Sequence, residues 1–87
     1  MASIDRTKYL FVGVDLHKKT HVAVLCNCFG DVMKQFKITN APNHFPAFLE
    51  DVKKHAEGKD IIFGLENVNF YGRSLAKFLI ANGYIVK

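Results

Sequence analysis

Several kinds of residue are scarce in this chain of 87 residues, and their scarcity narrows the classes of protein to consider. The sequence has no tryptophan, two prolines and two cysteines, and no apolar run approaches the roughly 20 residues that span a membrane. Residues 1–8 carry charges but no apolar region of signal-peptide length, and we expect them to be flexible. These absences argue against a membrane protein and against export, and they predict a protein of the cytoplasm.

The two cysteines, Cys26 and Cys28, lie two positions apart in a strand-like stretch. A disulfide between alternate residues of one strand would strain the backbone. A C-x-C pair without a second Cys or His pair nearby is a weak signal for zinc. We therefore expect both thiols to be reduced and partly buried.

The composition is that of a folded globular domain. The chain is 49% hydrophobic, 13% aromatic and 23% charged, and its length suits one small domain over residues 1–87. Lys and Arg number 12 against 8 for Asp and Glu, so the formal net charge is +4. This mild excess is compatible with a polyanionic partner but does not require one.

Two very apolar segments each end at a carboxylate. Residues 9–14 run into Asp15 and residues 61–65 run into Glu66, and such runs are typical of strands buried on both faces. Residues 21–26 and the alternating residues 32–39 predict two more strands, joined by short links into an antiparallel meander with the first. Lysines on both sides of residues 32–39 place that strand near a solvated edge.

Two helices separate the remaining strands. The first begins at Asn43 as N-cap, has Pro46 in its first turn and ends near Gly58. The second spans about residues 70–82, and residues 84–86 begin a fifth strand. The residues expected on the inner face of the second helix are Tyr71, Leu75, Phe78 and Leu79.

This order predicts an α/β fold with a mixed five-stranded sheet in the order 3-2-1-4-5. Helical crossovers make strands one, four and five parallel. Strands one and four are then neighbours roughly 5 Å apart, and Asp15 and Glu66 meet at one rim. Because the chain stops within the fifth strand, we expect it to be the N-terminal fragment of a longer protein.

Two neighbouring carboxylates repel each other unless a proton or cation intervenes, and Mg²⁺ or Mn²⁺ suits hard oxygen ligands. A pair of such ions supports phosphodiester chemistry, but two carboxylates are too few to hold both. The alternative is that Asp15 and Glu66 are ordinary polar residues at the ends of strands.

The sequence resembles the insertion sequence one-ten family of transposases. The resemblance rests on V-G-V-D-L-H-K-K-T-H-V-A-V at 12–24, G-L-E at 64–66, Y-G-R-S-L-A-K-F-L at 71–79 and G-Y-I-V at 83–86. It implies an RNase H-like domain of the RuvC type with a D-E-D-D set of ligands for two Mg²⁺ or Mn²⁺ ions. Asp15 matches the first acid and Glu66 the second.

The resemblance implies further features of the parent protein. The last two acids follow the fifth strand as D-x-x-D, so the fragment alone is expected to be inactive. The resemblance also implies a separate C-terminal domain with a serine implicated in strand exchange. The partners it implies are DNA and a guide-like RNA made by the element. Family members commonly have Thr-Gly shortly after the glutamate, where this chain has Val68 and Asn69.

Basic residues near the expected rim are candidates for phosphate contacts: Lys18, Lys19 and Arg73. A solvated loop explains the two lysines equally well. His17 and His21 are alternative ligands for a transition metal, although the pattern fixes no geometry. Tyr71 is either a base-stacking residue or, as its helical spacing favours, part of the core.

The leading function is therefore DNA transposition by metal-dependent strand cleavage and transfer. A non-catalytic nucleic-acid-binding or assembly module is the alternative. An actin-like ATPase or sugar kinase ranks lower, because those proteins place glycines just after the first acid, and residues 16–19 contain none. The short fifth strand predicts an unpaired edge, and we expect a homo-oligomer.

Overall fold

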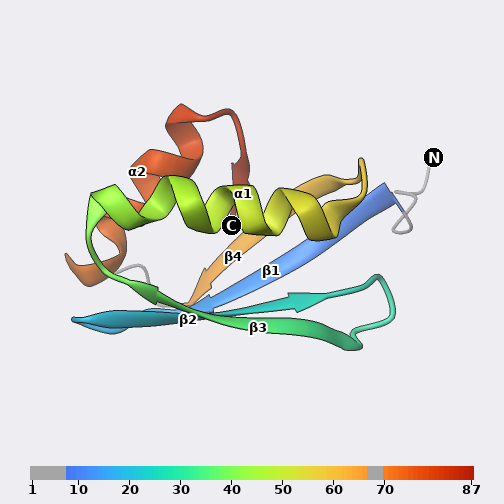
Figure 1. Ribbon diagram of the computed structural model, residues 1–87, viewed down its shortest axis with the longest axis horizontal. Helices are drawn as coiled ribbons and strands as arrows, with labels where there is room; N and C mark the ends of the chain where they lie inside the picture. Colours follow the sequence, from blue (N-terminus) through green and yellow to red (C-terminus); the bar gives the residue numbers. More distant parts are fainter. Residues whose placement is uncertain (1–7, 67–69) are drawn as a thin grey trace.

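The computed structural model describes residues 8–66 and 70–87 (Figure 1). The expectation of flexibility for residues 1–8 falls, apart from Lys8, outside the described residues, as does the local difference at Val68 and Asn69. Within these ranges, no helix has the length and apolar character needed to cross a membrane. The elements are β1 (Tyr9–Asp15), β2 (Thr20–Cys26), β3 (Val32–Thr39), η2 (Pro42–His44), α1 (Phe45–Ala56), β4 (Asp60–Glu66), η3 (Phe70–Gly72), α2 (Arg73–Ala81) and β5 (Ile85–Val86).

The five strands form one sheet in the order β3-β2-β1-β4-β5. β2 pairs antiparallel with both β1 and β3, whereas β4 pairs parallel with β1 and β5. The predicted strand order and directions are confirmed. Both cysteines are free and half-buried, as expected.

Both helices cover the same face of the sheet (Figure 1). Alternate residues of β1 are buried on that face, because successive side chains of a strand point to opposite sides. The residues buried there from β1 and β4 are Leu10, Val12, Val14, Ile61, Phe63 and Leu65. They share one hydrophobic cluster with helix residues that include Phe45, Phe48, Val52, Leu75 and Leu79. The opposite face carries no helix among the described residues.

The start of α1 differs from the prediction. Asn43 is not the N-cap, because residues 42–44 form the 3₁₀ turn η2 and α1 begins at Phe45. His44 occupies the cap position without a side-chain hydrogen bond, and Pro46 lies in the first turn as expected. Helical geometry ends at Ala56, and Glu57 and Gly58 both adopt positive φ, at 52° and 83°. Glycine tolerates this conformation readily, so Gly58 helps to end the helix.

The predicted inner face of the second helix is correct for Leu75 and Leu79, which are fully buried, and Phe78 is partly buried against the core. Tyr71 is 39% exposed, so its assignment to the core is wrong. The reason is local geometry. Tyr71 lies in η3, and the α-helical period that would align it with Leu75 begins only at Arg73.

Candidate metal centre

Asp15 and Glu66 are the last residues of β1 and β4, and the two residues are partners in the parallel register. Neighbouring strands lie about 5 Å apart, so the two residues share one end of the sheet. Both are exposed. The predicted adjacency of these two acids is confirmed.

A shallow hollow of about 280 Å³ lies at this end, lined by Gly13, Val14, Asp15, Val22, Val24, Gly64 and Glu66. Asp15 shares its face with Gly13, because the intervening Val14 is buried beneath the helices. The acids therefore belong to the face that the helices leave open.

Two glycines form the floor of the hollow. Gly13 and Gly64 are register partners, and a Cβ atom added to either would meet nothing within 4 Å. The absence of two side chains at neighbouring positions makes the depression beside the carboxylates. This feature was not predicted from the sequence. Its signal was the shared spacing, because each glycine stands two residues before its acid.

His17 contacts Asp15, and His21 contacts His17. The Nε2 atom of His17 is 3.1 Å from Oδ2 of Asp15, and both side chains are more than half exposed. The backbone N–H of His17 donates a hydrogen bond of 3.1 Å to Nδ1 of His21. His21 is fully buried, and that burial lowers its pKa below the usual value, with the neighbouring His17 adding to the effect and the Asn40 side chain opposing it.

This arrangement does not support His17 and His21 as a pair of metal ligands. Nδ1 of His21 is already an acceptor, and its ring has no exposed surface. Across residues 8–66 and 70–87, no group of three or more His, Cys, Asp and Glu side chains converges on one metal position. The described part of the site therefore offers a pair of carboxylates.

The three basic candidates lie at the same end of the sheet. Lys18 and Lys19 are exposed in the loop that follows Asp15, and Arg73 is exposed at the start of α2. Gly72 brings α2 close to that loop, because a Cβ atom on Gly72 would lie 2.5 Å from Cδ1 of Leu16. In the described ranges, no ion pair engages these three cations.

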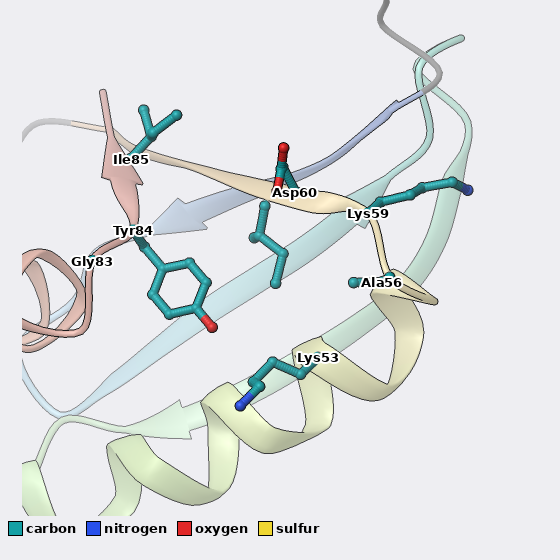
Figure 2. A pocket seen from close by; sticks show the side chains of 9 residues that line it. Lys53, Ala56, Lys59, Asp60, Gly83, Tyr84 and Ile85 are labelled. Carbon is teal, nitrogen blue, oxygen red and sulfur yellow. The ribbon is translucent and has the colours of Figure 1, made fainter.

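A larger cavity, of about 590 Å³, lies at the other end of β4. Figure 2 shows Tyr84, the residue before β5, and Lys53 of α1 extending into it, while Asp60 points away. Asp60 begins β4, and its register partner is Tyr9 rather than a second acid. This cavity has more room than the hollow but lacks a pair of carboxylates.

The chain is similar to known proteins both in sequence and in fold. Residues 12–87 match the model of a family described as a transposase, the DEDD type of insertion sequence one-ten. No curated protein matches the chain. Among solved structures, the chain is similar to the X-ray crystal structure of Marinitoga piezophila Argonaute in complex with 5′ OH guide RNA, with a TM-score of 0.57 and 17% identity. The likeness covers 94% of this chain and 16% of that one, and it shows the RNase H-like fold.

Proposed function

Because the chain belongs to the insertion sequence one-ten family of DEDD transposases, we propose that it is the N-terminal part of a catalytic domain that cuts and rejoins DNA with divalent cations. The observation that carries the proposal is the register pairing of Asp15 with Glu66 beside an open hollow. The two residues supply the first half of the ligand set. Since no third acid joins them in the described ranges, the 87-residue chain alone is inactive on DNA.

The donor set fits Mg²⁺ or Mn²⁺. Carboxylate oxygens are hard ligands, and two carboxylates on register partners of neighbouring strands repel each other unless a proton or a cation intervenes. Bound to a complete ligand set, such ions would supply Lewis-acid activation for phosphodiester chemistry. In this chain, Asp15 and Glu66 would hold such a cation, and the Nε2 atom of His17 lies 3.1 Å from Oδ2 of Asp15.

The proposed partners of the chain are nucleic acids. Lys18, Lys19 and Arg73 contact phosphates, since all three are exposed at the end of the sheet that bears the acids. The partners are DNA and an element-encoded, guide-like RNA, and the parent protein acts in the cytoplasm as a homo-oligomer. The Argonaute complex with its guide RNA is a parallel from a protein that shares the fold.

Calorimetric titration with Mn²⁺ tests the metal site. Asp15→Asn and Glu66→Gln should each weaken binding about tenfold or more, equivalent to about 1.4 kcal/mol, because each removes one charged ligand. Asp60→Asn is the matched control, since it neutralises an exposed acid at the other end of β4. Equal binding by all four proteins would refute the assignment. Absence of binding by the wild type would favour a non-catalytic nucleic-acid or assembly module.

Fluorescence anisotropy with labelled DNA tests the phosphate contacts. The double substitution of Lys18 and Lys19 by Ala should weaken DNA binding. It should also reduce the slope of log affinity against log salt concentration by about one to two, because each phosphate contact that is lost means that about one counterion fewer is released on binding. Replacing Lys53 and Lys54 by Ala removes the same charge from the last turn of α1. If both double variants weaken binding equally, only net charge matters and the loop is not a specific contact.

A further inference from the structure

Asn40, the first residue after β3, makes hydrogen bonds to two separate stretches of backbone. Its backbone N–H donates to the carbonyl of Lys19 at 2.8 Å, and its side-chain Nδ2 donates to the carbonyl of Lys18 at 3.0 Å. The same Nδ2 lies 3.2 Å from the carbonyl of Tyr71 in η3. One amide thus binds the loop of residues 16–19 and also the turn that leads into α2.

His21 also binds this loop, through the backbone N–H of His17. A ring nitrogen that accepts a hydrogen bond carries no proton, so Nδ1 of His21 is unprotonated and the neutral ring has its proton on Nε2. That Nε2 is buried and has no hydrogen-bond partner in the described part of the chain. A fully buried ring that accepts one backbone N–H fixes where the chain passes at His17.

The position of His17 decides how Asp15 is presented. Its Nε2 contacts one carboxylate oxygen of Asp15 at 3.1 Å, although both side chains are exposed and have no other hydrogen bond in the described ranges. An exposed contact of this kind persists only if the backbone beneath it is held. The bonds from Asn40 and His21 provide that support, because they fix the loop at three successive residues, 17–19.

The loop also packs against the residue that precedes α2. Gly72 lies against Leu16 so closely that a Cβ atom would be 2.5 Å from Cδ1 of Leu16, and the carbonyl bonded by Asn40 belongs to the residue just before Gly72. Asn40 therefore sets the loop that follows Asp15 and the start of the helix that begins with Arg73 relative to one another.

We propose that Asn40 and His21 are positioning residues of the carboxylate site: they hold residues 16–19 so that His17 stays on Asp15 and the first turn of α2 stays beside the loop. The inference rests on the proposed function for its role at the metal, but the hydrogen bonds themselves are properties of the metal-free chain. The sequence gives no sign of them, because Asn40 is 22 residues from Lys18 and 31 from Tyr71.

The test compares Asn40→Ala with two controls. Asn43→Ala makes the same substitution at an exposed position nearby, in η2. Val52→Ala truncates a fully buried side chain of α1, so it lowers stability without removing a bond to the loop. Two quantities are measured for each variant: the exchange rate of the His17 amide in metal-free protein, and the dissociation constant for Mn²⁺.

Asn40→Ala should speed exchange of the His17 amide and weaken Mn²⁺ binding about tenfold, the low end for loss of a group that supports a metal ligand. Asn43→Ala and Val52→Ala should leave Mn²⁺ binding by the folded protein unchanged. The proposal is overturned if Asn40→Ala changes neither quantity, or if Val52→Ala weakens Mn²⁺ binding as much. If the wild type binds no Mn²⁺, the proposed function fails, and the exchange rate alone still decides whether Asn40 holds the loop.

His21→Asn gives a second, conservative check. The Asn side chain can present an oxygen as acceptor to the His17 N–H but cannot fill the space of the ring. If acceptance by His21 is what positions the loop, this variant should keep more of the His17 amide protection than His21→Ala. Equal loss in both variants would contradict a role for the hydrogen bond and leave only packing of the ring.

Discussion

The two ends of the parallel strands carry different kinds of hollow. The end at which β4 begins has the larger cavity, about 590 Å³, with lysines and one acid on its rim. The end at which β1 and β4 finish has about 280 Å³, but there two acids are register partners. Volume alone would select the first end. The donor atoms select the second, because a small hard cation needs oxygen ligands rather than space.

The direction of α1 accounts for part of the positive charge near the larger cavity. Lys53, Lys54 and His55 occupy the last turn of α1, where positive groups are stabilised by the helix dipole. Lys53, one of the two lysines on the rim of the larger cavity, therefore has a structural explanation without a ligand. Lys18 and Lys19 lie in a loop rather than a helix, so the dipole does not explain them.

Removing the aromatic packing between the two ends of β4 should have the largest effect on the free energy of unfolding. Phe63 is fully buried midway along β4, and its ring lies 6.3 Å from that of Phe48 and 5.6 Å from that of Tyr84. Phe63→Ala should cost about 3–5 kcal/mol, measured by urea unfolding. Phe29→Ala is the control, since Phe29 is 82% exposed and should change stability by less than about 0.5 kcal/mol. Similar costs would contradict the assigned core.

Disturbing the packing at the end of the sheet that bears Asp15 and Glu66 should have an intermediate effect on stability. Gly72→Val forces a branched side chain against Leu16 and should cost about 1–3 kcal/mol, less if the Leu16 side chain rotates away. Gly13→Ala is the comparison, because its Cβ meets nothing within 4 Å. Thermal unfolding of both variants measures the difference. Equal melting temperatures would show that α2 does not approach Leu16 as described.

Acidification should weaken the fold through His21. Burial lowers the folded-state pKa of His21 below the unfolded value of about 6.5, so the unfolded chain binds more protons as the pH falls below that value. The stability due to the neutral ring is present above about pH 6.5 and is lost as the pH falls toward the lowered pKa. Unfolding free energies at several pH values should show a shallower decline for His21→Asn than for the wild type. Parallel curves would mean that His21 does not titrate this way.

Breaking the ion pair at the lysine-bearing end should have the smallest effect. Nζ of Lys53 is 3.4 Å from Oε1 of Glu50, and both side chains are about half exposed or more. Lys53→Ala should change the unfolding free energy by no more than about 0.5 kcal/mol, because water and salt screen such pairs. Mn²⁺ affinity should not change. A loss above about 1 kcal/mol would show that the larger cavity depends on this lysine more than its exposure indicates.

The sheet could be predicted because each strand carries its own pattern. Apolar runs before Asp15 and Glu66, alternation in residues 32–39 and two helical stripes were enough to determine order and direction. The adjacency of the two acids then followed from the crossover, because parallel neighbours end at the same rim.

The parts that could not be predicted depend on contacts distant in sequence or on short turns. The 3₁₀ turns before both helices displaced the expected cap from Asn43 and turned Tyr71 outward, because short turns leave little periodic signal. The bonds of Asn40 to Lys18 and Tyr71 appear only once the chain has folded. The hollow depends on Gly13 and Gly64 being neighbours, which follows from the predicted strand pairing only when the spacing of each glycine from its acid is compared between the two strands.

Paramagnetic line broadening by Mn²⁺ in an amide correlation spectrum of the wild-type chain tests most directly whether the cation binds at the end of the sheet that bears Asp15 and Glu66. If Asp15 and Glu66 hold the cation, the signals of Gly13, Asp15 and Gly64 should broaden first, while those of Tyr9 and Asp60 should stay sharp at the same Mn²⁺ concentration. Broadening centred on Asp60 and Lys59, or spread evenly over both ends of the sheet, would contradict it.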